Sequence, residues 1–189
     1  MLSAMKRLLY GVVLLAGFLC VPTSCTEEQD FSQIDDLSIT PVLASGLFYL
    51  ESDEATINSG SSGGPFYTRE VIFEAFSQDY VAERLLEGTI TYEMENTTSK
   101  PVRVLIEFLN AGGTVLDMEV LDISAEPSGL VTRDVFYGPG GKSLDILVNT
   151  ERLRISALNL GDTSSTSPVD DPKIILRSGA EFLFELKWE

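Results

Sequence analysis

Histidine is absent from this 189-residue chain, and cysteine occurs only twice. Without histidine the chain lacks the commonest general base, the usual zinc ligands and the imidazole of serine and cysteine triads. Basic residues are also scarce, because 13 Lys and Arg stand against 29 Asp and Glu, for a formal net charge of −16. Such a chain repels phosphates, so we expect no nucleic-acid partner. We also predict no catalytic residue, no metal and no cofactor.

The N-terminal segment has the pattern of a secretory signal. Two basic residues at positions 6 and 7 precede an apolar run over residues 8–21. This run is shorter than the roughly 20 apolar residues that a membrane-spanning helix needs. Pro22 ends the run, and two small residues then stand immediately before Cys25. The arrangement indicates cleavage before Cys25.

Thr23-Ser24-Cys25 resembles the lipobox of bacterial lipoproteins, and the acidic run over residues 26–30 resembles the tethers of surface lipoproteins in Bacteroidota. The resemblance implies that residues 1–24 are a lipoprotein signal peptide and that Cys25 is the lipidated first residue of the mature chain. It also implies an outer-membrane lipoprotein, at the periplasmic face or the cell surface, which meets the membrane through its lipid anchor. A plain secreted protein and an uncleaved anchor are the alternatives.

The rest of the chain divides into a tether and one domain. Residues 25–36 are acidic with little apolar content, and we interpret them as a solvated, self-repelling linker. Residues 37–189 are long enough to bury a core of their own without a disulfide or a metal. We therefore expect a single folded domain over residues 37–189.

Apolar and polar residues alternate with a period of two along this domain, which is typical of half-buried β-strands. The strands predicted in this way cover residues 87–95, 102–109, 114–123, 130–137, 152–158 and 180–188. The predicted core face of 102–109 consists of Val102, Val104, Ile106 and Phe108, and that of 114–123 consists of Leu116, Met118 and Val120.

The connections complete the fold prediction. Residues 96–101 form a predicted turn that closes a hairpin between 87–95 and 102–109, and residues 110–113 form another turn. Short helices are expected at 80–86, after the cap-like Ser77, and at 143–149. Together the pattern predicts an all-β fold, an antiparallel β-sandwich of the immunoglobulin-like kind, with one or two short helices.

Acidic and basic residues supply the candidate binding sites. Asp162, Asp170 and Asp171 lie in one polar loop, residues 161–172, and are candidate calcium ligands. Their spacing is not that of an EF-hand, so we favour a solvated acidic loop. Arg152 and Arg154 share one face of strand 152–158, and we expect them to pair with acids across the sheet.

Aromatic residues are a second group of candidates. Tyr67, Tyr80 and Tyr137 lie near predicted loop or strand ends, where they are freer to contact a ligand. Trp188, the only tryptophan, is in register with the apolar face of strand 180–188, and we expect it to pack in the core or at a sheet edge.

These observations favour a non-catalytic, membrane-tethered β-sandwich that binds or braces another envelope component, either a protein or a glycan. Four solvent-side apolar residues are candidates for a partner surface or for the second layer of the sandwich: Leu105, Val115, Leu121 and Leu183. The alternative function is a calcium-dependent carbohydrate-binding module or a carboxylate-based glycan hydrolase on the same fold.

Overall fold

The structure, a computed structural model, describes residues 38–73, 75–76, 78–125 and 128–187. The signal peptide (1–24), Cys25, the tether (25–36), Ser77 and Trp188 lie outside the described residues, and what we predicted of them stays a prediction. No helix within the described ranges has the length and apolar character to cross a membrane.

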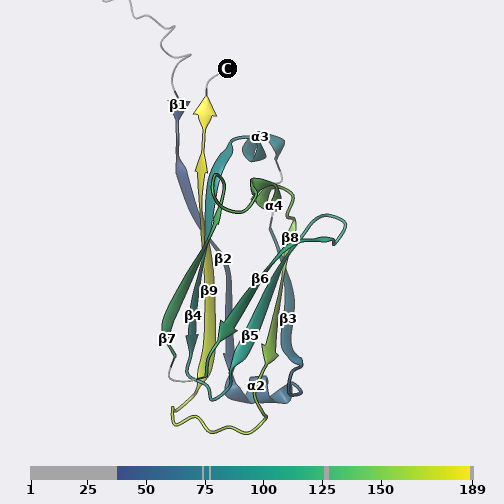
Figure 1. The fold of residues 1–189 in the computed structure, drawn as a ribbon, viewed down its shortest axis with the longest axis vertical. Helices are drawn as coiled ribbons and strands as arrows, with labels where there is room; N and C mark the ends of the chain where they lie inside the picture. Colours follow the sequence, from purple (N-terminus) through teal and green to yellow (C-terminus); the bar gives the residue numbers. More distant parts are fainter. Residues whose placement is uncertain (1–37, 74, 77, 126–127, 188–189) are drawn as a thin grey trace, which may run out of the picture. The chain divides into compact units, whose positions relative to one another are not determined.

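Strands make up most of the described chain (Figure 1). The elements are, in order, β1 (Ser38–Ile39), β2 (Val42–Asp53), α2 (Glu54–Ser59), β3 (Pro65–Ile72), α3 (Asp79–Ala82), β4 (Leu85–Asn96), β5 (Val102–Leu109), β6 (Val115–Ile123), β7 (Ser128–Tyr137), α4 (Leu144–Val148), β8 (Arg152–Asn159), β9 (Lys173–Phe184) and β10 (Leu186–Lys187).

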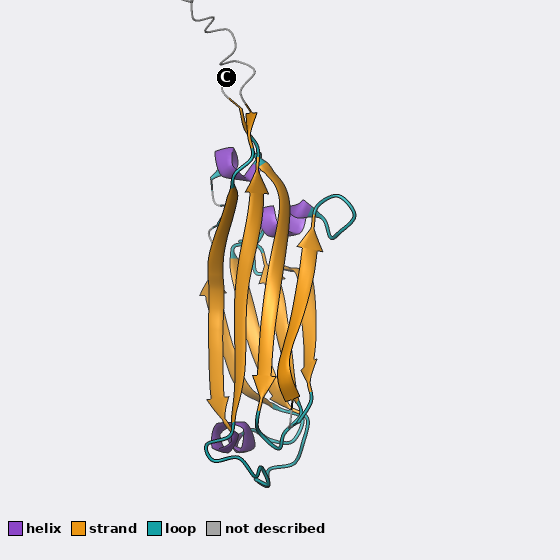
Figure 2. Ribbon diagram, turned by 90° about the vertical axis from the view of Figure 1, so that its left-hand side faces the viewer, coloured by secondary structure: helices purple, strands orange, loops and turns teal. Residues whose placement is uncertain are grey.

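Two antiparallel four-stranded sheets form the layers of a sandwich, with α3 and α4 at one end and α2 at the other (Figures 1 and 2). The strand orders are β2-β9-β4-β7 and β3-β8-β5-β6, while β1 and β10 form a separate two-stranded ribbon. The expected β-sandwich is therefore confirmed. Its eight strands follow the order of a jelly roll rather than that of a seven-stranded immunoglobulin domain.

The predicted hairpin over residues 96–101 is wrong, because this segment carries the chain from one sheet to the other. β4 pairs with β7 and β9, whereas β5 pairs with β6 and β8. The buried Asn96 amide donates to the carbonyls of Lys100 (2.8 Å) and Ser124 (2.9 Å), and its oxygen accepts from the Thr98 backbone N–H. Asn96 thus satisfies backbone groups that have no ladder partner at this crossing. The turn at 110–113 does close a hairpin, between β5 and β6.

The core lies between the two sheets, and the predicted core face of β5 is confirmed. Val102, Val104, Ile106 and Phe108 are all fully buried. In β6 the predicted faces are wrong from Met118 onward: Met118 is 47% exposed, whereas Glu119 is 2% exposed. Leu116, predicted on the core face, does pack against the core. β6 has apolar residues on both faces, so alternation alone does not orient it. Leu121, predicted on the solvent side, likewise belongs to the core.

Of the two predicted helices, the second is confirmed. Residues 144–148 form α4, and the Ser143 hydroxyl accepts from the Asp145 N–H at its N-cap. The first is shorter than predicted, because α3 ends at Ala82 and the chain joins β4 at Leu85, which pairs with Phe184. The alternation also missed β2, β3, α2 and the first half of β9.

Candidate functional site

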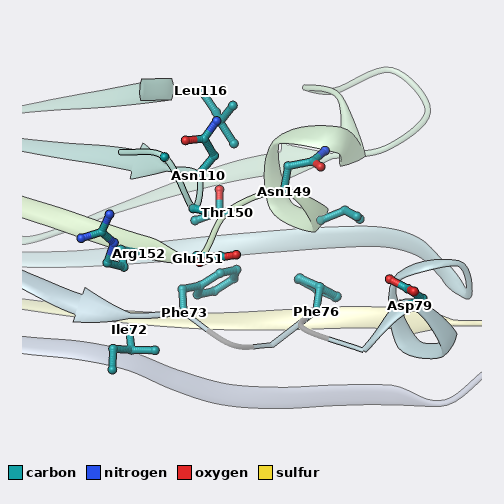
Figure 3. A pocket seen from close by; sticks show the side chains of 13 residues that line it. Ile72, Phe73, Phe76, Asp79, Asn110, Leu116, Asn149, Thr150, Glu151 and Arg152 are labelled. Carbon is teal, nitrogen blue, oxygen red and sulfur yellow. The ribbon is translucent and has the colours of Figure 1, made fainter. Parts of the chain in front are cut away.

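An open groove of about 810 Å³ lies at the end of the sandwich that carries α3 and α4 (Figure 3). Four parts of the chain line it: Ile72 at the end of β3 with Phe73 and Phe76 after it, Asp79 at the start of α3, residues 110–112 and Leu116 of the β5–β6 hairpin, and residues 148–152 from α4 into β8. Its volume falls within the roughly 300–1,000 Å³ of small-molecule pockets. Two of these segments connect strands of different sheets, and the turn at 110–112 connects two strands of one sheet. The jelly-roll topology therefore brings the segments together at the groove.

The floor of the groove is apolar and tied to the core. Phe73 and Phe76 are each 5% exposed, and their ring centroids are 6.0 Å apart. Phe76 also meets the Phe182 ring edge-on at 5.0 Å. The Phe73 N–H donates to the Glu151 carbonyl at 2.7 Å, which joins two walls of the groove. These contacts tie the floor of the groove to the core.

Amide and hydroxyl side chains stand around this floor, as Figure 3 shows. The Asn110 side-chain oxygen accepts from the Thr114 N–H (2.9 Å), and the Asn149 amide donates to the Asp145 carbonyl (2.7 Å). These bonds fix both side chains. Among the described residues they leave the Asn110 amide nitrogen and the Asn149 side-chain oxygen to bond something in the groove.

Charged side chains complete the groove. Asp79 and Glu151 are exposed, and neither carboxylate has an ion-pair or hydrogen-bond partner among the described residues. The Arg152 guanidinium lies 3.0 Å from the Glu70 carboxylate on the neighbouring strand, and this ion pair neutralises the charge of Arg152. The groove is therefore locally negative.

A second cluster of charges surrounds the buried Glu119, at the side of the sandwich where β6 and β7 are the edge strands of opposite sheets. The Glu119 carboxylate binds Lys142 and, at 2.7 Å, Arg133 of β7, and Lys142 also binds Asp117. Burial alone would lower the pKa of Lys142, but the bonds to Asp117 and Glu119 outweigh it and raise the pKa. The cluster links the two sheets and is structural in character.

Two tyrosines next to this cluster are buried. The pKa values of Tyr92 and Tyr137 are raised, mainly by burial and further by nearby carboxylates. Tyr137 is fully buried against Phe108, and its hydroxyl has no hydrogen-bond partner among the described residues. The expectation that Tyr137 is free to bind a ligand is therefore wrong. Tyr80 is 60% exposed and lies under the Arg84 guanidinium at 3.6 Å, and Tyr67 is half-buried.

The calcium candidates do not come together. Asp162 binds the buried Lys100, and that bond lowers the pKa of Asp162, while Asp171 lies 2.9 Å from Lys173. In the described part of the chain, no group of three or more Asp, Glu or Cys side chains is arranged to hold a metal ion. Asp162 and Asp171 thus each have a cation of the protein as partner.

The predicted pairing of Arg152 and Arg154 is confirmed. Both bind Glu70 at 3.0 Å, and Arg154 also reaches Glu107 at 3.2 Å. With Arg103–Asp122 at 2.6 Å, these pairs cover the outer face of the β3-β8-β5-β6 sheet with balanced charge.

The groove residues were missed by sequence reasoning. Asn110 was recognised only as part of a turn, and Asn149 only as the end of a helix. Residues 149–151 are polar, but the sequence does not reveal that they meet the turn at 110–113, because that depends on the topology.

Comparison with known proteins adds only distant likenesses. No protein-family model and no curated protein matches the sequence. Among solved structures, the VP2 subviral particle of infectious bursal disease virus matches with a TM-score of 0.40 and 9% identity over 77% of this chain and 32% of that chain. A Bacillus endospore appendage pilus matches with a TM-score of 0.34 and 9% identity, over 77% and 91% of the two chains. Desmodium yellow mottle tymovirus matches with a TM-score of 0.35 and 10% identity, over 81% and 90%.

This chain spans about a third of the length of the infectious bursal disease virus chain. All of these similarities are too remote to bear on function, and none enters the argument below.

Proposed function

We propose that this protein is a membrane-tethered envelope lipoprotein whose β-sandwich binds or braces another envelope component without catalysing a reaction. Cys25 is its lipid anchor, and residues 25–36 are its tether. The observation that carries the binding role is the groove at the α3–α4 end of the sandwich, with its apolar floor and polar rim. Such a surface, concave and held by the core, is what binding sites have in common.

The position of the groove supports this role. β1, the first described strand, lies at the same end of the sandwich as α3 and α4 (Figure 1). Beside it, the Phe184 N–H donates to the Pro41 carbonyl and the Glu185 N–H to the Arg84 carbonyl, just after α3. The described part of the domain therefore begins at the end that carries the groove. A partner in the same membrane would meet this end within the reach of a short linker.

The alternative of a glycan hydrolase or carbohydrate-binding module has one supporting observation. Asp79 and Glu151 place two carboxylates on the same groove, and paired carboxylates are the groups that glycosidases use. A glycan-cleaving activity that disappears in Glu151→Gln would favour this alternative over binding alone.

In-cell photo-crosslinking tests the binding role. A photoreactive residue in place of Ile72, which is 70% exposed at the groove, is compared with the same residue in place of Thr163 in the loop at the opposite end. We expect a discrete crosslinked envelope species from position 72 that is absent from position 163. Identical patterns from the two positions, or no product from position 72, would contradict the proposal.

A further inference from the structure

The groove has an uneven charge balance that points to the chemistry of its occupant. Asp79 and Glu151 stand on its rim without a cationic partner among the described residues, and Arg152 is already bound to Glu70. An anionic ligand would be repelled by these two carboxylates. A cation placed between the groove walls would instead form new ion pairs in a partly desolvated setting.

The apolar part of the groove reaches the surface. Ile72 is 70% exposed and Leu116 is half-buried, and the buried rings of Phe73 and Phe76 line the same groove. An aliphatic side chain entering here would exchange water for contacts with core residues. Apolar recesses next to charged groups are typical of the anchor points of protein interfaces.

We infer that the groove receives a segment of a protein partner in which an aliphatic side chain is flanked by lysine or arginine. The aliphatic side chain fills the recess beside Phe73 and Phe76, and the cation pairs with Asp79 and Glu151. The amides of Asn110 and Asn149 bond the backbone of the segment, which carries both donors and acceptors. This inference rests on the proposed binding function and names the surface and the chemistry of the partner.

Short fluorescent peptides test the inference by fluorescence anisotropy at low salt. The probe has a lysine-leucine-lysine core, and the controls replace leucine by serine or both lysines by glutamate. Because the leucine would be buried, the probe should bind roughly tenfold more tightly than the serine peptide, and the glutamate peptide should not bind. Equal affinity of the leucine and serine peptides would show that the recess is not used. A neutral oligosaccharide that displaces the probe would show that the groove is a glycan site.

Two charge-matched double variants locate the binding. Asp79→Asn with Glu151→Gln removes two charges from the groove, and Glu93→Gln with Glu181→Gln removes two from the outer face of the β2-β9-β4-β7 sheet. The groove variant should bind the probe roughly tenfold more weakly than the wild type does, and the control variant should bind it with unchanged affinity. All four positions are at least partly exposed, so both variants should melt at the wild-type temperature.

If both variants bind the probe equally more weakly than the wild type, the overall negative charge of the protein explains the effect, and the inference is overturned. Crosslinking at position 72 without binding of the lysine-leucine-lysine peptide would overturn the partner chemistry while leaving the proposed function standing. Absence of both would overturn the two together.

Discussion

At the scale of single residues, the buried carboxylate of Glu119 is the feature that the sequence conceals most completely. It lies at a position where alternation would place a solvent-facing residue, and it is tolerated because Lys142 and Arg133 both bind it. Neither cation is near Glu119 in sequence. A buried charge with two cationic partners is stable in place, but removal of one of them leaves the carboxylate only partly compensated, which is costly.

Lys142→Met should therefore destabilise the protein by more than about 1 kcal/mol, but by less than the roughly 3–5 kcal/mol of a fully buried pair, because Arg133 still binds Glu119. The control is Lys173→Met, because Lys173 pairs with Glu51 and Asp171 at the surface, where an ion pair contributes at most about 1 kcal/mol. Urea unfolding of the two variants and the wild type measures both values. Similar losses for the two substitutions would mean that the Glu119 cluster has no special role in stability.

Glu54 gives a prediction about pH. Burial alone would raise its pKa, but hydrogen bonds from the Ser99 hydroxyl and the Ser99 N–H (3.0 Å) outweigh burial and lower the pKa. A carboxyl group with a lowered folded-state pKa stabilises the fold above its unfolded value of about 4.3, and this stabilisation disappears as the pH falls through the folded value.

Glu54→Gln should thus reduce the free energy of unfolding at pH 7, and the difference from wild type should shrink as the pH falls below about 4. Unfolding by urea at several pH values between 7 and 3 measures the difference. A difference that stays constant over this range would show that the charge of Glu54 contributes nothing.

At the scale of elements, the crossing at residues 96–101 has a single residue at its centre. Asn96 is fully buried and bonds the carbonyls of Lys100 and Ser124 as well as the Thr98 N–H. If the side chain is removed, the buried Lys100 carbonyl and Thr98 N–H lose this partner, and each buried unsatisfied group costs about 1–3 kcal/mol.

Asn96→Ala should consequently lower the free energy of unfolding more than Ser143→Ala does. The latter substitution removes one helix cap, at a cost of about 1 kcal/mol. Thermal unfolding followed by circular dichroism compares the two variants. A melting temperature for Asn96→Ala at or above that of Ser143→Ala would contradict the role assigned to this crossing.

The same crossing shows how far alternation goes in predicting the fold. Alternation found β4 to β8 and the core face of β5, since a period of two is a property of one strand alone. It misassigned residues 96–101, because a turn sequence specifies that the chain reverses but not which sheet it joins. It missed β2, where Gly46 interrupts the pattern and the pairing register with β9 shifts. Alternation misassigned β6 from Met118 onward, because the cations that allow Glu119 to be buried come from other parts of the chain.

At the scale of the whole molecule, the two outer sheet faces differ in charge. The charged side chains on the face of β3-β8-β5-β6 are paired arginines and acids, whereas those on the face of β2-β9-β4-β7 are mostly acids. The acids on this second face include Glu51, Glu93, Glu95, Asp134 and Glu181, which lie beside Lys173 and Arg177. The acidic face opposes self-association and favours solubility. The groove could not be predicted from the sequence, because four segments from different parts of the chain build it.

The proposals share one premise, that the domain is held at a membrane through Cys25. The lipid chains would supply nearly all of its membrane affinity, because a single lipid chain binds marginally and two or more anchor firmly. The chain contains one other cysteine, Cys20, which lies within the apolar run and provides a matched control.

Incorporation of radiolabelled palmitate, followed by membrane fractionation, is the most direct test of this premise. The wild type and Cys20→Ser should take up the label and sediment with the membrane, whereas Cys25→Ser should take up no label and appear in the soluble fraction. Equal labelling of Cys25→Ser and the wild type would contradict the account.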